Sequence, residues 1–233
     1  MAYIEFKNVC KNYGDDEVKT KALKNVSFEI NKGELVVITG PSGAGKTTLL
    51  NILGGIDNLS SGDVIVNKVN ISNLKERRLT EYRRKNVGFI FQFYNLSENL
   101  TAKENIDLVS ELMNKKIDAI STLKKVGLTK KVDFFPHELS GGECQKVAIA
   151  RAISKNPKIL LCDEPTGALD SKGGKQILKL LQKLANKDKM TVIIITHNNQ
   201  ISSIADKVVQ IKNGSITKVK MNRKPKLAGD LEW

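Results

Sequence analysis

A glycine-rich segment between an apolar run and a helix-like run is the part of this sequence best suited to chemistry. Gly40-Pro41-Ser42-Gly43-Ala44-Gly45-Lys46-Thr47 fills every fixed position of the pattern G-x-x-x-x-G-K-[ST], between apolar residues 35–38 and an amphipathic run at 48–53. Glycines let backbone N–H groups wrap around phosphate oxygens, and the following helix adds the positive end of its dipole. We expect a nucleoside triphosphate site rather than a ligand-free turn, with Lys46 on the β- and γ-phosphates and the Thr47 hydroxyl on Mg²⁺.

A pair of acidic residues follows another apolar run. Residues 159–162 are apolar and lead directly into Asp163 and Glu164. At the end of a parallel strand beside a phosphate loop, the first carboxylate can hold Mg²⁺, and the second can polarise an attacking water as a general base. An apolar strand followed by Asp-Glu often marks only a strand end, so this interpretation depends on the pairing with Lys46 and Thr47.

Two further positions have both a structural and a functional interpretation. Ser140 and Glu143 fit the S-x-x-E capping box of a helix start, while Ser140 with the Gly141 and Gly142 amides could bind an anion at the same helix N-terminus. One chain with one phosphate loop does not need a second anion site, but two facing chains do. A lone histidine at a strand end is usually structural, yet His197 follows an apolar run at the expected carboxyl edge of the sheet, beside the predicted γ-phosphate.

These residues need a scaffold of alternating strands and helices. Strand patterns are expected at 2–9, 26–30, 35–38, 63–66, 87–91, 158–163 and 191–196, with turns at 12–16 and 59–62 and a closing hairpin at 207–219. Helices are expected at 48–53, 75–85, 141–154 and 172–186. Strands that alternate with helices predict a mostly parallel sheet, and the first two alternating segments predict an antiparallel layer. The fold class is therefore α/β.

The pattern changes to helices alone between residues 97 and 139. Thr101 and Glu104 form a capping box for a helix that reaches Met113, and a second periodic segment at 117–126 ends at Gly127. We expect one domain over residues 1–220, with a core built from 1–96 and 140–220 and a helical insert at 97–139. Residues 221–233 are expected to form a basic, poorly ordered C-terminal tail.

The composition is compatible with some classes of protein and not with others, but it does not identify the partner. The 233 residues include 38 Lys+Arg and 25 Asp+Glu, for a net charge of +13, which suits nucleotide, nucleic acid or an anionic membrane face. No basic run is interleaved with aromatic residues as in a single-strand-binding surface. No apolar stretch approaches the roughly 18 residues that span a bilayer, and the N-terminus has no signal-peptide pattern. The three distant cysteines are typical of reduced thiols in a cytosolic protein.

Together these motifs resemble the nucleotide-binding subunits of ATP-binding cassette (ABC) transporters over nearly the whole chain. Residues 40–47 correspond to Walker A, 139–143 to the signature, and 159–163 to Walker B with Glu164 beside it. The resemblance implies a P-loop NTPase fold with a RecA-like core, an N-terminal antiparallel β layer and a small helical subdomain. It also implies that ATP is hydrolysed to ADP and phosphate.

The resemblance assigns a role to each matching residue. Gln92 matches the Q-loop, Asp170 the D-loop, His197 the switch histidine, and Tyr13 the aromatic that stacks on adenine and favours ATP over GTP. The implied ATP contacts are Tyr13, Gly40, Pro41, Ser42, Gly43, Ala44, Gly45, Lys46, Thr47, Thr48, Ser140, Gly141, Gly142 and Asp170. The implied Mg²⁺ ligands are Thr47, Gln92 and Asp163, and the implied catalytic residues are Glu164, His197, Lys46 and Gln92. Because Ser140 and Gly142 would close the site of a second copy, an ATP-dependent head-to-tail homodimer is also implied.

Residues 40–43, 91–96 and 163–170 are similar to one branch of this family, which includes macrolide exporters, lipoprotein-releasing ATPases, antimicrobial-peptide resistance transporters and the cell-division cassette protein. This implies a separate integral membrane permease, peripheral association at the cytoplasmic face of the cell membrane, and export of a peptide, lipid-linked or hydrophobic substrate. Two alternatives stay open: an ATPase that drives a membrane signalling or mechanotransmission complex without transport, and a nucleic-acid-associated ABC ATPase. No nucleic acid is expected as a partner.

The chain departs from the branch pattern in a few places. Glu143 stands where Gln is common, Lys146 where Arg is usual, and Asn198 where Asp is frequent. Only 46 residues separate Gln92 from Leu139, so we expect a trimmed helical subdomain whose contact with the permease differs.

Overall fold

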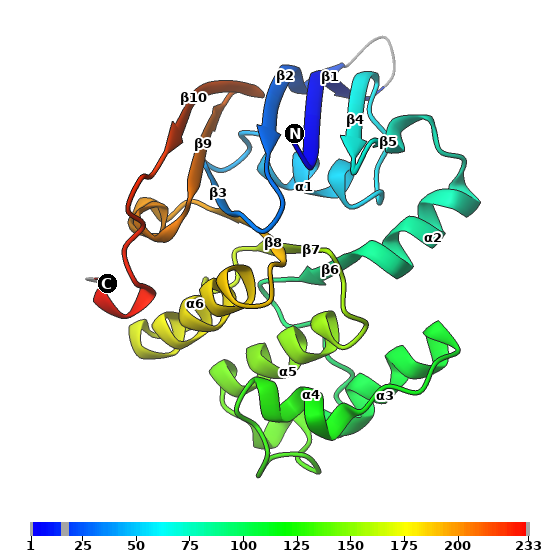
Figure 1. The fold of residues 1–233 in the computed structure, drawn as a ribbon, viewed down its shortest axis with the longest axis vertical. Coiled ribbons are helices and arrows are strands. Elements are labelled where there is room, and N and C mark those ends of the chain that lie inside the picture. Colours follow the sequence, from blue (N-terminus) through cyan, green and yellow to red (C-terminus); the bar gives the residue numbers. More distant parts are fainter. Residues whose placement is uncertain (1, 15–18, 232–233) are drawn as a thin grey trace.

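An antiparallel sheet forms the top layer of the fold, as drawn in Figure 1. The computed structural model describes residues 2–14 and 19–231. Strands of this sheet are ordered β2-β1-β4-β5, with bounds β1 (Ile4–Tyr13), β2 (Thr20–Ile30), β4 (Ser61–Val66) and β5 (Val69–Asn70). The predicted antiparallel layer is thus confirmed. The expected turn at 12–16 is wrong for Asn12 and Tyr13, which belong to β1, and Asp15 and Asp16 lie outside the described residues. The expected turn at 59–62 is wrong for Ser61 and Gly62, which belong to β4.

The second described sheet is central and mostly parallel. Its order is β10-β9-β3-β8-β7-β6, and only the β9–β10 hairpin is antiparallel. The bounds are β3 (Leu35–Thr39), β6 (Val87–Ile90), β7 (Ile159–Asp163), β8 (Thr191–Thr196), β9 (Lys207–Lys212) and β10 (Ser215–Met221). The parallel sheet and the hairpin are both confirmed, and β8 has the predicted bounds. Because β3, β7 and β8 are parallel neighbours, their carboxyl ends meet at one edge.

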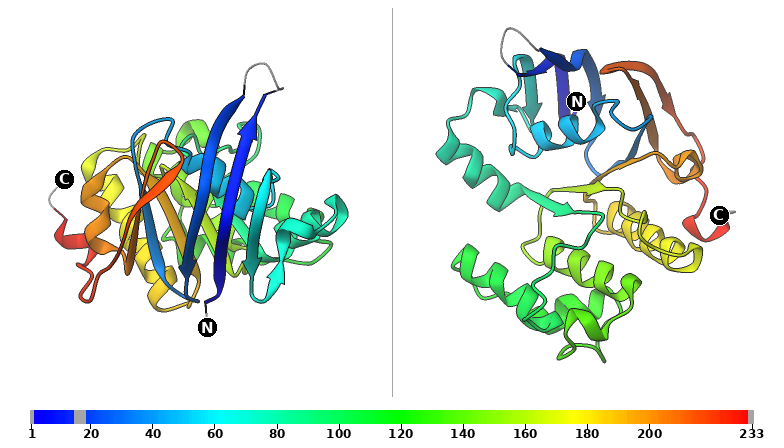
Figure 2. Two further views of the ribbon diagram at one scale, coloured as in Figure 1. Left: turned by 90° about the horizontal axis from the view of Figure 1, so that it is seen from above. Right: turned by 180° about the vertical axis from the view of Figure 1, so that it is seen from behind.

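Helices cover both faces of the central sheet. The bounds are α1 (Lys46–Leu53), α2 (Glu76–Asn86), α3 (Ala102–Met113), α4 (Ala119–Lys125), α5 (Gly141–Ile153) and α6 (Ser171–Asn186), with short 3-10 turns at η1 (Ile71–Asn73), η2 (Pro136–Glu138), η3 (Asn199–Ile204) and η4 (Ala228–Asp230). Helix α1 lies between the two sheets, whereas α5 and α6 lie on the opposite face (Figure 2). None of the helices in the described part of the chain has the length and apolar character to cross a membrane.

Strand β3 shows why the sheet holds helices on both sides. Its residues are all buried, but Val36 and Ile38 join the core around α1, while Leu35 and Val37 join the core of α5 and α6. A strand buried on both faces reads as a continuous apolar run, and successive side chains point to opposite faces. The core that contains Val36 and Ile38 therefore fixes α1, and with it the phosphate loop, against the central sheet.

The helical insert packs onto α5. Helix α3 begins at the expected capping box and ends at Met113, whereas the second helix is shorter than expected and is capped by the Asp118 carboxylate, which accepts from Ser121 N at 2.9 Å. Ile106 of α3 and Leu123 of α4 are fully buried in the same core as Ala150 of α5. The insert and the lower face of the sheet therefore share one hydrophobic core.

The chain after Lys220 does not form the poorly ordered tail expected from its composition. Ala228 and Leu231 are buried in the core beside α6. Gln182 of α6 ties this segment down, because its Nε2 donates to Lys226 O at 2.8 Å and its Oε1 accepts from Ala228 N at 3.0 Å. The prediction was wrong for residues 221–231, since a few apolar residues anchor a segment that is otherwise basic. Residues 232 and 233 lie outside the described part.

Candidate functional site

The phosphate loop runs from the end of β3 to the start of α1, and two of its glycines are required by close backbone contacts. A Cβ on Gly40 would lie 2.1 Å from the Ile211 carbonyl oxygen, and one on Gly45 would lie 2.5 Å from the Ala22 carbonyl oxygen. Gly45 also has φ 99°, in the left-handed region that favours glycine. The strands that hold Ile211 and Ala22 therefore set the shape of the loop before any ligand binds.

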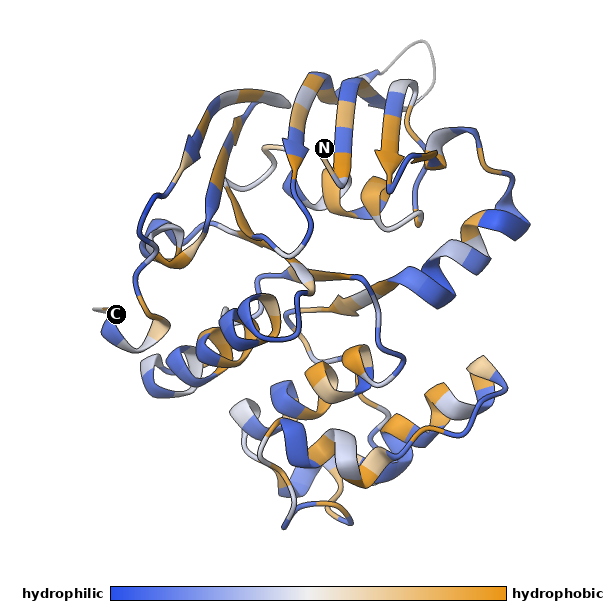
Figure 3. Cartoon of the chain, in the orientation of Figure 1, coloured by the Kyte–Doolittle hydropathy of each residue, from blue (hydrophilic) through white to orange (hydrophobic). Residues whose placement is uncertain are grey.

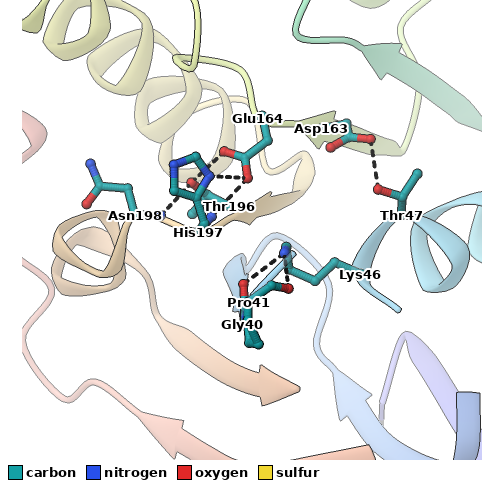
Figure 4. Close-up of polar contacts among 9 residues, drawn as sticks. All are labelled: Gly40, Pro41, Lys46, Thr47, Asp163, Glu164, Thr196, His197 and Asn198. Carbon is teal, nitrogen blue, oxygen red and sulfur yellow. Dashed lines mark hydrogen bonds and ion pairs between the residues drawn. The ribbon is translucent and has the colours of Figure 1, made fainter. Parts of the chain in front are cut away.

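The N-terminus of α1 has a positive character and no side-chain cap. Gly45 occupies the N-cap position and supplies no side-chain hydrogen bond. Lys46 is 8% exposed, and its Nζ donates to the carbonyl oxygens of Gly40 at 2.8 Å and Pro41 at 2.9 Å, as Figure 4 shows. The first N–H groups of a helix lack intrahelical partners, so this end of α1 presents unpaired donors beside a held ammonium group. That combination fits a phosphate.

Thr47 and Asp163 join the phosphate loop to the end of β7. The Thr47 hydroxyl donates to Asp163 Oδ2 at 3.2 Å. Burial raises the pKa of the Asp163 carboxyl, and the Glu164 charge raises it further, while the Thr47 hydrogen bond and the Lys46 charge lower it. A hydroxyl and a carboxylate are oxygen donors of the kind that Mg²⁺ prefers, so this pair fits that ion. Gln92 lies beside the segment that follows β7, because its Nε2 is 3.0 Å from the position that a Cβ on Gly167 would take.

Glu164 is held by the end of β8. Its backbone N–H donates to Ile195 O at 3.0 Å, and its φ is 46°, a left-handed conformation that is sparsely populated for residues other than glycine. Its Oε1 accepts from His197 N at 2.9 Å and lies 2.8 Å from His197 Nδ1, while its Oε2 accepts from the Thr196 hydroxyl at 2.9 Å (Figure 4). Such conformations cluster at functional sites. The side chain of His197 is 67% exposed, which leaves its outer part open to a ligand.

Tyr13 lies at the end of β1, where two charged residues hold it. Its hydroxyl donates to Asp57 Oδ2 at 2.5 Å, and Lys11 Nζ lies 4.6 Å from the ring centroid and 2.6 Å from Asp57 Oδ1. A cation over the ring face is a favourable cation–π contact. The residue is 40% exposed, so Tyr13 is both held and accessible to a flat ligand.

The signature residues lie at a different helix start from the phosphate loop, the N-terminus of α5. Ser140 Oγ accepts from Glu143 N at 3.3 Å, and Glu143 Oε2 accepts from Ser140 N at 2.9 Å and Ser140 Oγ at 3.0 Å. The hydrogen bond from Ser140 N lowers the pKa of the Glu143 carboxyl despite its partial burial. Within a single chain, Ser140 therefore forms the contacts of a capping box, which is the structural one of its two interpretations.

Asp170 lies beside the signature rather than beside the phosphate loop. Its Oδ1 accepts from Gly173 N at 2.9 Å and so caps α6. A surface hollow is lined by Ser140, Gly141, Gly142 and Asp170 together with their neighbours. No hydrogen bond among the described residues joins any of these four to Lys46, Thr47 or Glu164. The candidate residues thus form two groups in one chain.

Sequence reasoning missed several residues that contact the candidate site. Thr196 ends the predicted strand 191–196 and could have been found from that position, since it shares a sheet edge with Asp163. Lys11 and Asp57 have no local pattern that pairs them. Gln145 of α5 is fully buried and its Nε2 donates to Pro165 O at 2.8 Å, which links α5 to the segment after β7.

Comparisons with known proteins relate this chain to one family. A family model described as "ABC transporter" matches residues 23–167. A putative ABC transporter ATP-binding protein of Mycoplasma genitalium is 43% identical over 99% of this chain, which spans about half (50%) of that relative. The macrolide export ATP-binding/permease protein of Campylobacter jejuni is 44% identical over 91% of this chain and 33% of its own length. The dimeric post-hydrolysis structure of the ATP-binding cassette MJ0796 of Methanocaldococcus jannaschii, bound to ADP and Pi, has a TM-score of 0.86 and 39% identity, covering 95% of this chain and 99% of that one.

Proposed function

This chain belongs to the ABC transporter family, and on that basis we propose that it binds ATP with Mg²⁺, hydrolyses it, and powers a separate membrane permease. The observation that carries the proposal is the gathering of Lys46, Thr47, Asp163 and Glu164 at the carboxyl ends of β3, β7 and β8 (Figure 4). In open α/β sheets, ligands bind at this edge.

Lys46 and the start of α1 bind the triphosphate in this proposal. The Lys46 ammonium exchanges its bonds to the Gly40 and Pro41 carbonyl oxygens for phosphate oxygens, and the unpaired N–H groups of the loop donate to the same oxygens. Thr47 and Asp163 hold Mg²⁺, which neutralises phosphate charge when bound. The Tyr13 ring stacks on the adenine base.

Glu164 orients the attacking water and takes up its proton. A carboxylate has about four acceptor sites, and the three contacts from Thr196 and His197 leave one site on Oε2 for the water. The His197 ring contacts Glu164 through Nδ1, so its other nitrogen is the one that would contact the γ-phosphate. Both side chains act at the same place because they meet at the ends of adjacent strands.

A second copy of the chain completes each site. Ser140, Gly141, Gly142 and Asp170 form a group that has no hydrogen bond to the phosphate-loop group among the described residues. In a head-to-tail homodimer, each copy presents this group to the nucleotide of the other. The dimeric structure of the related MJ0796 cassette with ADP and Pi supports this proposal.

An apolar groove between α2, β6, α3 and α5 is the proposed docking site for the permease. Its walls include Leu108 and Leu112 of α3, which are 39% and 73% exposed, and the hydrophobic turns of α3 are visible in Figure 3. Four basic side chains also line it: Arg83, Arg84, Arg151 and Lys155. An apolar floor with basic residues fits a short amphipathic helix with acidic residues, supplied by the membrane protein at its cytoplasmic face. Gln92 follows β6 and would transmit the state of the nucleotide to this groove.

Export of a peptide, lipid-linked or hydrophobic substrate is the proposed use of this energy. The support is the 44% identity to a relative that is named a macrolide export protein. The permease would choose the substrate, since the residues assigned in this proposal would contact nucleotide and partner rather than cargo.

Replacement of Glu164 by Gln tests the central proposal. Glu164→Gln removes the base but keeps the shape, so it should bind ATP, lose turnover and run as a dimer on gel filtration with ATP. Adding Ser140→Ala to this variant should return it to a monomer, because the contact across the dimer is lost. Unchanged turnover would refute the role of Glu164, and a monomer at saturating ATP would refute the shared site.

A further inference from the structure

The hydroxyl group of Thr196, buried at the end of β8, is both a hydrogen-bond donor and a hydrogen-bond acceptor. It is 1% exposed, its Oγ1 donates to Glu164 Oε2 at 2.9 Å, and the same oxygen accepts from Asn198 N at 3.1 Å. A buried hydroxyl is stable when its hydrogen bonds are satisfied, so these two contacts fix the Thr196 side chain itself. Thr196 is thus a rigid donor aimed at the carboxylate.

Each oxygen of the Glu164 carboxylate has a different partner. Oε1 is held by the backbone and ring of His197, whereas Thr196 is the partner of Oε2 within the described chain. The last torsion of a glutamate side chain is broad and roughly two-fold, so contacts to one oxygen do not fix the plane of the carboxylate. The Thr196 contact to Oε2 supplies a second point of attachment, and the contacts to both oxygens together fix the plane of the carboxylate.

ATP binding is also expected to affect the two partners of the Glu164 carboxylate, His197 and Thr196, differently. His197 is exposed and is the residue proposed to contact the γ-phosphate, which draws its ring away from Glu164. Thr196 is buried within β8 and stays where the sheet places it, since Asp163 pairs with Ile195 in the parallel register. Thr196 is therefore the contact that persists when the site is occupied.

We infer that Thr196 is a positioning residue for hydrolysis: its hydroxyl orients the Glu164 carboxylate so that the free acceptor site of Oε2 meets the attacking water. This inference rests on the proposed role of Glu164 as the base. A misplacement of a catalytic group by roughly 1 Å lowers the rate about 100-fold. Thr196 itself touches neither nucleotide nor water.

A valine and a serine at position 196 separate the hydroxyl from the shape of the side chain. Thr196→Val removes the donor and should lower kcat about 10- to 100-fold, while the KM for ATP and the equilibrium ATP affinity change by less than about twofold. Thr196→Ser keeps the donor and should restore most of kcat. With hydrolysis slowed, Thr196→Val should also accumulate the ATP-bound dimer on gel filtration, as Glu164→Gln does.

Thr191→Val is the matched control, at the other end of the same strand. Thr191 is fully buried, and its Oγ1 accepts from Gly33 N at 3.0 Å, so its loss leaves a backbone N–H unpaired just as the loss of Thr196 does at Asn198. Thr191→Val should lower stability without lowering kcat or trapping the dimer. If Thr196→Val does not fold, Thr196→Ala takes its place in the comparison with Thr196→Ser.

The possible outcomes separate the inference from the proposed function. Equal kcat in Thr196→Val and Thr191→Val, or no rescue by Thr196→Ser, overturns the positioning role while the loss of turnover in Glu164→Gln still supports the base. Full turnover in Glu164→Gln overturns the base, and the inference with it. A kcat loss confined to the position 196 variants that lack a hydroxyl supports the inference.

Discussion

The helices α1 and α5 both have glycines at their N-termini, Gly45 at the N-cap of α1 and Gly141 and Gly142 in the first turn of α5, but the two N-termini are capped in opposite ways. At α1, Gly45 supplies no side-chain cap, and the neighbouring cation is Lys46. At α5, Ser140 and Glu143 close a complete capping box, so a carboxylate occupies the positive end of the helix. The first start lies between two sheets, whereas Ser140 is exposed.

This difference separates strong from weak anion binding. A helix N-terminus attracts negative charge, and at α1 that charge must come from a ligand. At α5 the Glu143 carboxylate already supplies it, and an approaching phosphate meets a like charge. We infer that α1 binds nucleotide in a single chain, and that α5 contributes only after a second chain has brought its own bound nucleotide close.

Among the variants that test this difference between α1 and α5, replacement of Lys46 should have the largest effect. Lys46→Ala removes a donor to two phosphates, and charge-assisted hydrogen bonds contribute about 1.5–3 kcal/mol each, so ATP affinity should fall at least about 100-fold. Fluorescence titration with a labelled ATP analogue measures it. Lys207→Met is the control, because Lys207 is 6% exposed and also donates to a backbone oxygen, that of Glu29 at 2.6 Å. Comparable ATP affinity in both variants would contradict the role of Lys46.

Loss of Ser140 should have a smaller effect that appears only between chains. Ser140→Ala removes the N-cap and should cost about 1 kcal/mol of stability. It should leave ATP affinity of the monomer unchanged and weaken ATP-dependent dimerisation and turnover.

Thr101→Ala is a control within the same chain. Thr101 and Glu104 form the same capping box at α3, with Glu104 Oε2 accepting from Thr101 N at 2.8 Å. The two variants should lose similar stability by thermal denaturation, but Thr101→Ala should dimerise normally. If both variants lose dimerisation equally, Ser140 acts only as a cap.

The sequence predicted most of the fold, and it named the residues that meet at the candidate site, for a physical reason. Strand β8 was predicted with its observed bounds because residues 192–195 are an uninterrupted apolar run, as expected for a strand buried on both faces, with a β-branched threonine at each end. The α/β class followed from such runs alternating with helical periods, and the structure confirms it. Lys46 and Thr47 were found because a phosphate loop is local in sequence.

Contacts between distant segments were the part that sequence patterns did not predict. Lys11 and Asp57 meet at Tyr13 only because β1 and the segment after α1 lie side by side. The packing of Ala228 and Leu231 beside α6 was missed because local composition there is dominated by basic and polar residues. The full capping box at Ser140 was foreseen as one of two alternatives, and the pattern alone could not say that Glu143 would occupy the helix end.

The charge of Glu143 gives the smallest and most specific test of the comparison. Its lowered pKa keeps it ionised at neutral pH, and its Oε2 accepts from both Ser140 N and Ser140 Oγ. Glu143→Gln keeps an acceptor for the cap but removes the negative charge. A surface charge at a helix terminus contributes about 0.3–1 kcal/mol, so helix α5 should lose about that much stability. The same energy acts in the opposite direction between chains, because the γ-phosphate no longer meets a carboxylate.

The ATP concentration for half-maximal dimerisation should therefore fall by about two- to fivefold in Glu143→Gln, measured by gel filtration in the non-hydrolysing Glu164→Gln background. Glu104→Gln makes the same change in the capping box of α3, which faces no nucleotide in the proposed dimer, and should leave dimerisation unchanged. Weaker dimerisation in Glu143→Gln would show that the carboxylate supports the shared site rather than opposing it. An equal shift in both variants would trace the effect to net charge, and the contrast between α1 and α5 would then lose its electrostatic basis.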